Sequence, residues 1–421
     1  MNSILSNEFN RNVTKLVLGT GFAQIIPIAL TPILTRIYSP EDFGIFAIYM
    51  AIASILGVIA TARYELSIVL PKNDKNALDI FYLCNIVSFS LSFIFFIFIY
   101  IFTEELNIFI GLDSYSNILF LLPLSIIAAG LLQSLSYLLV RRKEFSSLSK
   151  SKIFLSGGYS SSQLTFGSIF SASGLNLSIG YISGQFFSIF YLIKKNWAFL
   201  KSRDFSTRRI YNIAKKYKKF PMYSSPGAIM DTSAVQVPII LINKFFNSNL
   251  TGQFSLTMRI INLPLAFIGS SISQVLLNKI ADSDHTHPDR VLPLLISLTF
   301  KLLIFILPLV IICFLFGEEL FVYVFGPNWA FAGSLAAPIS IVIAIRFVVS
   351  PLSAVLTLDR NIKLAAAWQG LYFTSTVIIL TVAAQIGFES FIKYFVINEL
   401  IMYSIYYFLI IRGSLSYKHV N

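Results

Sequence analysis

The sequence predicts an all-α polytopic membrane protein, and three features lead to this fold class: composition, recurring apolar segments and alternating loop charge. Of the 421 residues, 56% are hydrophobic and 12% are charged, whereas about 25% of residues are charged in an ordinary soluble protein. Apolar segments of about 20 residues recur along the chain, and a helix of that length crosses roughly 30 Å of hydrocarbon. These properties exclude a soluble globular protein.

The apolar segments predict twelve transmembrane helices. In chain order they are expected at 14–35, 40–61, 77–102, 115–138, 150–170, 174–193, 223–243, 251–275, 292–316, 331–357, 364–386 and 391–411.

Lysine and arginine alternate between two sets of loops. The set that includes both chain ends holds most of them, and the other set holds only Arg36, Lys244 and Lys393. Cytoplasmic loops are the basic ones in membrane proteins, so both termini are expected in the cytoplasm. We expect no cleavable signal ahead of the first span. The net charge of +12 follows from this topology and does not indicate nucleic-acid binding.

A weak internal repeat predicts two halves. TRIYSPEDFGIFAIYMAI (35–52) aligns without gaps on NKFFNSNLTGQFSLTMRI (243–260), and Gly44 then meets Gly252. In each copy a span ends at a cation, a short polar turn follows, and the next span begins. Six spans separate the copies, which is typical of parallel repeats. Chance similarity between two apolar segments is the alternative.

The domain organisation follows from this repeat. We expect an N-terminal six-helix lobe over 1–193, a basic amphipathic cytoplasmic linker over 194–222 and a C-terminal six-helix lobe over 223–421. Within the linker, Ile210 and Tyr217 belong to an apolar stripe at helical spacing, surrounded by basic residues. This pattern suits a helix on the acidic inner leaflet, and a charged linker without that role is the alternative.

The sequence contains no nucleophile elbow, phosphate-binding loop or nucleotide-binding fingerprint. His285 and His287 lie in a polar loop, where a solvated turn is expected rather than a metal site. The outer loops are short, whereas an enzyme that acts on sugars usually needs more polar chain. We therefore expect a secondary transporter with no catalytic residues, no metal and no cofactor other than a coupling ion, H⁺ or Na⁺.

Five charged residues lie inside the predicted spans: the cations Arg259, Lys301 and Arg346 and the acids Asp231 and Glu399. A cation at the bilayer centre costs at least about 2.5–3.5 kcal/mol, so each should face water or an acid. Two acids cannot neutralise three cations, and the surplus suits a phosphate-bearing substrate. Arginine is preferred here because its planar fork grips two phosphate oxygens at once.

Each of these charges also has a structural interpretation. Lys301 is a candidate for substrate binding, but it could reach the cytoplasmic surface along its own stem or pair with Glu399. Arg346 is another substrate candidate or a charge that joins packed helices. Asp231 and Glu399 are candidates for ion coupling, because an acid in a membrane cavity can exchange a proton or Na⁺; otherwise they are salt-bridge partners.

Several segments together resemble one transporter family. They are LTRIYSPEDFGIFAIY (34–49), ARYELSIVLP (62–71), KFPMYSSPGAIMD (219–231), GQFSLTMRIINLPLAFIGSSISQV (252–275), FGPNWAFAG (325–333) and SPLSAVL (350–356). In this order they are similar to Wzx-type O-antigen and oligosaccharide-repeat flippases of the multidrug/oligosaccharidyl-lipid/polysaccharide exporter superfamily. The resemblance extends over nearly the whole chain.

This resemblance implies twelve helices in two six-helix lobes around a central cavity lined mainly by helices one, two, seven and eight. It places Arg259 and Asp231 in cavity helices, and Arg36 and Arg63 at the ends of cavity helices. The other two intramembrane cations lie outside those helices. The resemblance thus favours Arg259, Arg63 and Arg36 as substrate-binding residues. Arg346 and Lys301 remain candidates because they are cations inside predicted spans.

The implied function is movement of an undecaprenyl-diphosphate-linked oligosaccharide from the cytoplasmic to the periplasmic leaflet of a bacterial inner membrane, driven by cation antiport. The expected partners are this lipid-linked oligosaccharide, membrane lipids, a polysaccharide polymerase and a chain-length regulator, and no nucleic acid. A multidrug/cation antiporter of the same fold is the first alternative, although a net positive cavity disfavours cationic drugs. A membrane polysaccharide polymerase is the second.

Overall fold

The computed structural model describes residues 2–112, 116–202, 204–269, 272–273, 276, 291–357 and 362–415. These residues form helices and short connections, and no strand occurs among them. Contacts divide the chain into two compact units. Unit 1 comprises Met1–Gln236 and Asn247–Thr251, and unit 2 comprises Val237–Phe246 and Gly252–Asn421.

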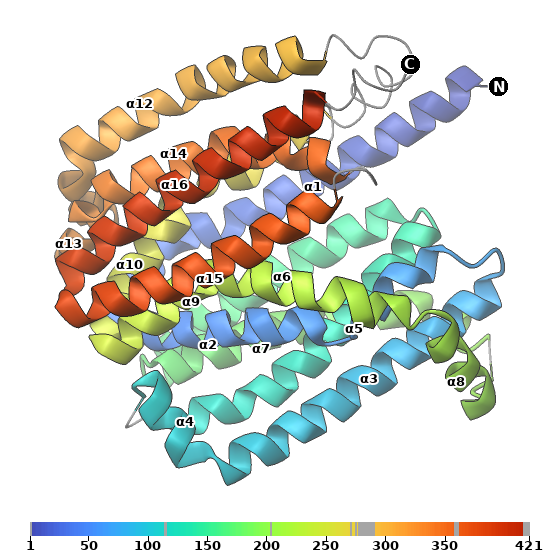
Figure 1. The fold of residues 1–421 in the computed structure, drawn as a ribbon. Coiled ribbons are helices and arrows are strands. Elements are labelled where there is room, and N and C mark those ends of the chain that lie inside the picture. The colour runs from blue at the N-terminus through green and yellow to red at the C-terminus, as the bar shows by residue number, and fades with distance from the viewer. Residues whose placement is uncertain are drawn as a thin grey trace. The chain divides into compact units, whose positions relative to one another are not determined.

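Unit 1 contains a helix bundle that the chain follows back and forth (Figure 1). Its elements are α1 (Asn2–Ile37), α2 (Pro40–Ile59), η1 (Tyr64–Val69), α3 (Asp74–Ile101), α4 (Thr103–Ile110), η2 (Ser116–Leu121), α5 (Leu122–Arg141), α6 (Phe145–Ile169), α7 (Gly174–Leu200), α8 (Thr207–Lys216) and η3 (Phe220–Ser224). The helix α9 (Ser225–Phe245) begins in unit 1 and ends in unit 2.

Unit 2 is also built from helices, several of them interrupted. Its elements are most of α10 (Ser248–Ile261), then η4 (Leu265–Gly269), α12 (Val291–Phe325), η6 (Pro327–Trp329), α13 (Ala330–Ser334), α14 (Ala336–Val349), η7 (Ser350–Thr357), α15 (Ile362–Ile386) and α16 (Phe388–Leu415). The stretch η4 is a π-helix and η7 is a 3₁₀-helix.

The predicted all-α polytopic fold is confirmed. All twelve predicted spans fall on helical elements within the described residues, and the eighth is described as far as 269. Nine of the described helices are long and apolar enough to cross a membrane. The helices outside this set include the serine-rich α6 and α10, which runs for 14 residues.

The two copies of the predicted repeat fold alike. Ser39 caps α2, and its side chain accepts a hydrogen bond from the backbone N–H of Asp42. At the matching position before α10, the Asn247 side chain accepts from the backbone N–H of Leu250 at 2.8 Å. Serine and asparagine are favoured caps because they satisfy N–H groups that the helix leaves unpaired. The same helix, turn and helix therefore occur at both places.

Helix packing in unit 1 depends on small residues. A Cβ atom added to Gly184 of α7 would lie 2.4 Å from the Tyr159 nitrogen and 2.6 Å from the Leu155 carbonyl oxygen of α6. This close approach also lets the Ser188 hydroxyl of α7 donate to the Ser151 carbonyl of α6 at 2.9 Å. Packing of this kind is typical of helices in membranes, where small residues let backbones approach.

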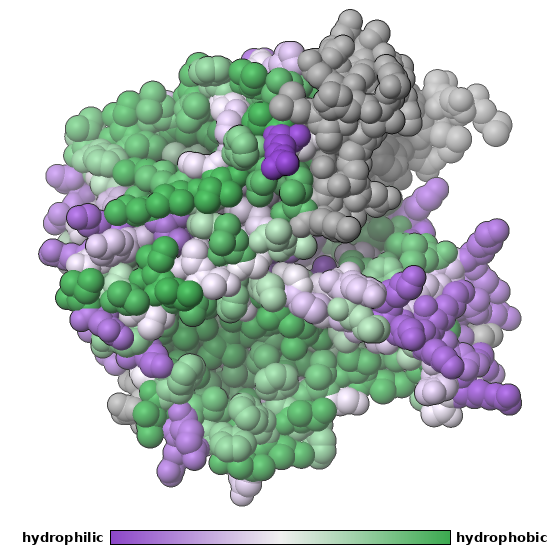
Figure 2. Space-filling view, in the orientation of Figure 1, coloured by the Kyte–Doolittle hydropathy of each residue, from purple (hydrophilic) through white to green (hydrophobic). Residues whose placement is uncertain are grey.

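The outward surfaces of α3 and α12 are apolar, as expected of helices that face lipid. Figure 2 shows hydrophobic residues over most of their visible surface, while hydrophilic residues gather around α8. On α12, the large side chains of Phe300, Ile304 and Phe305 are exposed. A soluble protein rarely exposes so continuous an apolar surface.

A helix, α8, lies in the segment predicted to be amphipathic. Ile210 is buried, and Ile213 and Tyr217 pack against the core cluster that α3 and α5 form, so the apolar stripe covers unit 1. Arg209 lies 3.5 Å from the buried Asp79 of α3, atom Nε to Oδ2, while the lysines of the last turn are exposed. The domain limits at 194–222 remain our proposal.

Candidate functional site

Arg63 lies in a strained turn between α2 and η1, outside the candidate spans Pro40–Ile59 and Asp74–Ile101. Ala62 and Arg63 have φ angles of 49° and 62°, the left-handed region that costs a non-glycine residue about 1–3 kcal/mol. The Arg63 Nη1 atom lies 3.6 Å from Oε1 of Glu65, and the two side chains are 28% and 2% exposed. The turn thus presents a half-buried cation next to an enclosed carboxylate.

Neighbouring helices hold the start of this turn. The Ser88 hydroxyl of α3 donates to the Ala60 carbonyl at 2.7 Å, and Gln133 Nε2 of α5 donates to the Gly57 carbonyl at 2.8 Å. Ser88 thus satisfies a carbonyl at the end of α2, and Gln133 is a second donor to the Gly57 carbonyl, which also accepts from the Ala60 N–H. A Cβ atom on Gly130 of α5 would lie 1.9 Å from the Ser88 hydroxyl oxygen, so glycine is required there.

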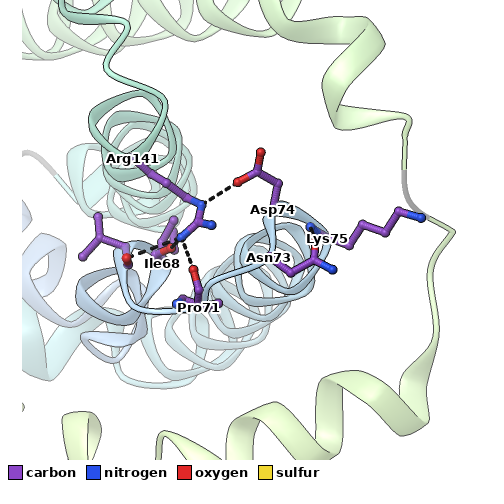
Figure 3. A network of polar contacts seen from close by, with 7 residues as sticks. Ile68, Pro71, Asn73, Asp74, Lys75 and Arg141 are labelled. Carbon is purple, nitrogen blue, oxygen red and sulfur yellow. Dashed lines mark hydrogen bonds and ion pairs between the residues drawn. The ribbon is translucent and has the colours of Figure 1, made fainter.

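Arg141 of α5 binds the segment between the end of η1 and the start of α3 (Figure 3). Its Nε donates to Asp74 Oδ1 at 2.9 Å, and its Nη1 donates to the Pro71 carbonyl at 2.5 Å. The same Nη1 lies 3.4 Å from the carbonyl oxygens of Ile68 and Val69. One guanidinium therefore joins the end of η1, the start of α3 and the end of α5.

Glu65 is buried, and its carboxylate accepts a hydrogen bond from the Thr61 hydroxyl. Burial raises the pKa of this carboxyl above its usual value, and the Thr61 hydrogen bond and the nearby Arg63 charge oppose the shift only in part. Sequence reasoning did not select Glu65, because a carboxylate just after a span resembles an ordinary loop residue. The signal that could have found it is its place two residues after Arg63 in ARYELSIVLP.

In unit 2, Arg346 of α14 and Glu399 of α16 form a buried ion pair. Arg346 Nε donates to Glu399 Oε2 at 2.8 Å. Tyr372 of α15 completes the network, because its hydroxyl accepts from Arg346 Nη2 at 2.9 Å and donates to Glu399 Oε1 at 2.6 Å. Glu399 is 0% exposed and Arg346 is 6% exposed, so three helices meet at one enclosed polar network.

Aromatic rings enclose this network. The Arg346 guanidinium lies 5.7 Å from the ring centroid of Tyr403, and the Trp368 ring stacks on Tyr372 with centroids 5.0 Å apart. The Trp368 indole N–H donates to the Met402 carbonyl at 3.0 Å. Because Glu399 and Tyr372 bind its guanidinium inside unit 2, Arg346 suits helix packing better than substrate binding. Glu399 therefore pairs with Arg346 rather than with Lys301.

Arg259 lies in the last turn of α10 and is half-buried. Side chains of the same helix anchor it to its own unit: Gln253 Nε2 donates to the Asn328 carbonyl at 2.8 Å, and the Thr257 hydroxyl donates to the Ala332 carbonyl at 2.7 Å. After α10 the chain continues as the π-helix η4, and π-helical turns are frequent near functional sites. In the described part of the chain no carboxylate forms an ion pair with Arg259.

The remaining candidates occupy exposed positions. Arg36, at the end of α1, is exposed, and its Nη1 donates to the Pro32 carbonyl of the same helix at 3.1 Å. Lys301 is exposed on α12 between the apolar side chains of Phe300 and Leu302. Asp231 of α9 is exposed in unit 1. The loop with His285 and His287 lies outside the described residues.

A family model described as "Polysaccharide biosynthesis protein" matches residues 33–334. The chain belongs to this family. The match includes the turn with Arg63 and the helix with Arg259.

One relative of the chain is a transport protein. Succinoglycan biosynthesis transport protein ExoT of Rhizobium meliloti (strain 1021) is 21% identical over 337 residues, which are 78% of this chain and 65% of that protein. The chain thus spans about two thirds of that relative's length. Among solved structures, lipid II flippase MurJ is similar with a TM-score of 0.72 at 16% identity, over 96% of this chain and 90% of that one.

A multidrug resistance MATE family transporter of the MOP superfamily is also similar, with a TM-score of 0.67 at 13% identity, over 94% of this chain and 96% of that one. At such identities the likeness shows a common fold. The predicted resemblance to the exporter superfamily is therefore confirmed at the level of the fold, and the chain is a multi-pass membrane protein of a polysaccharide biosynthesis family.

Proposed function

We propose that the protein is a flippase that moves an undecaprenyl-diphosphate-linked oligosaccharide, an O-antigen or capsule repeat unit, from the cytoplasmic to the periplasmic leaflet of a bacterial inner membrane. Arg259 carries this proposal. It is a half-buried cation in a predicted span, and no described carboxylate pairs with it. Keeping such a charge in a membrane is costly unless an anion binds there, and a lipid diphosphate supplies one.

The membership in a polysaccharide biosynthesis family and the fold shared with a lipid II flippase support this cargo. With both termini in the cytoplasm, the turn with Arg63 lies at the cytoplasmic face and Arg36 at the outer face. In the proposed sequence, Arg63 meets the diphosphate first, Arg259 holds it during translocation, and Arg36 meets it last. Each of these guanidinium groups can bind two phosphate oxygens at once.

The coupling ion in this proposal is H⁺ or Na⁺, exchanged by alternating access. Asp231 is the better coupling candidate of the two acids predicted from the sequence, because it is exposed, whereas Glu399 is enclosed with Arg346 and Tyr372. A polysaccharide polymerase and a chain-length regulator are the proposed partners, because a flipped repeat unit must then be polymerised.

Deletion of the gene tests the cargo. We expect loss of surface polysaccharide and accumulation of lipid-linked repeat units on the cytoplasmic side of the inner membrane, both reversed by a plasmid copy of the gene. Surface polysaccharide at the wild-type level would contradict the proposal. Repeat units that accumulate on the outer face would instead indicate a polymerase.

The fold shared with a multidrug transporter keeps a drug/cation antiporter as the second candidate. This function predicts resistance to cationic drugs on expression, lost in an Asp231→Asn variant.

A further inference from the structure

The turn that carries Arg63 contains a carboxylate that competes with any bound anion for the Arg63 guanidinium. Glu65 lies two residues further along and is almost fully enclosed, while the Arg63 side chain is 28% exposed. The carboxylate is therefore fixed on the protein side of the guanidinium. The side of the guanidinium that remains open is available to an anion from solvent.

The separation of the pair leaves room for exchange. The distance between Arg63 Nη1 and Glu65 Oε1 is 3.6 Å, which is longer than the 2.7–2.9 Å typical of a charge-assisted hydrogen bond. The Nε atom of Arg63 is buried without a hydrogen-bond partner, so the guanidinium has donor capacity that Glu65 does not use. By contrast, the buried pair in unit 2 is joined at 2.8 Å.

We propose that Glu65 is the internal counter-ion of Arg63, that substrate phosphate displaces it from the guanidinium, and that Glu65 takes up a proton from solvent when this occurs. This inference rests on the proposed function and assigns a proton-linked loading step to it. This proton returns to the cytoplasmic side when phosphate leaves Arg63 and is distinct from the exchanged coupling ion. Each phosphate that binds at Arg63 then adds one proton at the Glu65 carboxylate.

The surroundings of Glu65 explain why a proton is needed. The groups that face it are the Thr61 hydroxyl and Arg63 from its own turn, Tyr137 of α5 and Cys84 of α3. Among these, only Arg63 carries a positive charge. Once phosphate engages Arg63, an ionised Glu65 would remain buried without a cation, which is costly, whereas the neutral acid retains its hydrogen bond with Thr61.

The sign of the linkage follows from this. Burial already raises the pKa of Glu65, and loss of Arg63 to phosphate raises it further. At a pH between the pKa of Glu65 in the free protein and its pKa in the phosphate-bound protein, phosphate binding takes up a proton. Binding therefore strengthens as the pH falls. One linked proton changes the dissociation constant by up to about tenfold per pH unit.

Isothermal titration calorimetry of the full chain in detergent micelles, with farnesyl diphosphate as the probe, tests this inference from pH 5.5 to 8.5. Two buffers with different ionisation enthalpies give the number of protons taken up. We expect proton uptake in the wild type and in Glu65→Asp. In Glu65→Gln the proton taken up by the Glu65 carboxyl should be lost. The ionisation of free farnesyl diphosphate is common to all variants, and Glu65→Asp shows whether the uptake depends on a carboxyl group at this position.

Glu104→Gln is the matched control, because it removes an exposed carboxylate beyond the far end of α3 and should behave as wild type. Arg63→Gln should weaken binding at least tenfold at every pH. If Glu65→Gln keeps the wild-type proton uptake while Arg63→Gln weakens binding, the inference is wrong and the proposed function stands. If the wild type does not bind the probe, or Arg63→Gln binds it equally well, the proposed loading role of Arg63 fails as well.

Discussion

Glu399→Ala is expected to lower the free energy of unfolding by about 3–5 kcal/mol, because it leaves the buried Arg346 charge without its counter-ion. The substitution also removes the acceptor of the Tyr372 hydroxyl, which now donates at 2.6 Å. Both groups stay enclosed between α14, α15 and α16, so bulk solvent does not reach them. The measurement is the midpoint of thermal unfolding of the purified chain in detergent.

Two variants separate this mechanism from a general loss of side-chain volume. Glu389→Ala removes an exposed carboxylate from the same helix and should change the free energy of unfolding by no more than about 0.5 kcal/mol. The triple variant Arg346→Met, Tyr372→Phe and Glu399→Leu should recover much of the loss, because apolar residues of similar volume can replace a buried ion pair and no buried hydroxyl is left unpaired. A triple variant as unstable as Glu399→Ala would contradict the ion-pair explanation.

Arg259→Ala is expected to weaken substrate binding roughly tenfold to 100-fold, because a hydrogen bond to a charged group contributes about 1.5–3 kcal/mol. In cells that lack the chromosomal gene, the variant should restore little surface polysaccharide. Arg259→Lys keeps the charge but loses the planar fork. Function retained in the lysine variant would show that charge is sufficient, and loss in both would show that the guanidinium geometry is required.

Lys301→Ala is the matched control for Arg259. It also removes one cation from a predicted span, but Lys301 is exposed among apolar side chains of α12. We expect surface polysaccharide near the wild-type level, with equal amounts of each variant in the membrane by immunoblot. A Lys301→Ala defect as large as that of Arg259→Ala would contradict the special role proposed for Arg259.

Hydropathy alone predicted the helices, because a membrane helix must satisfy its backbone hydrogen bonds internally and needs an apolar surface of fixed length. The spans predicted at 40–61 and 364–386 correspond to α2 (Pro40–Ile59) and α15 (Ile362–Ile386). The interruption after α10 coincides with Pro264, which directly precedes η4 and has no backbone N–H to donate. Its π-helical form was not predicted from the sequence.

The partners of the charged residues could not be predicted in the same way. The acid that pairs with Arg346 lies on α16, far along the chain, and only the packing of α14 against α16 brings them together. The contact between Arg63 and Glu65 lies in a turn with left-handed backbone at Arg63, a conformation usually reserved for glycine or asparagine. Composition and periodicity carry no information about either feature.

Transport in proteoliposomes tests the proposed flippase activity most directly. A fluorescent lipid-diphosphate oligosaccharide is incorporated in both leaflets, and a membrane-impermeant reagent bleaches the outer one. With the wild-type chain we predict that bleaching proceeds beyond the outer-leaflet fraction towards completion, and that Arg259→Ala proteoliposomes stop at that fraction. Bleaching that stops at the outer-leaflet fraction with the folded wild-type chain, under an imposed H⁺ or Na⁺ gradient, would contradict the assignment of a lipid-linked oligosaccharide as cargo.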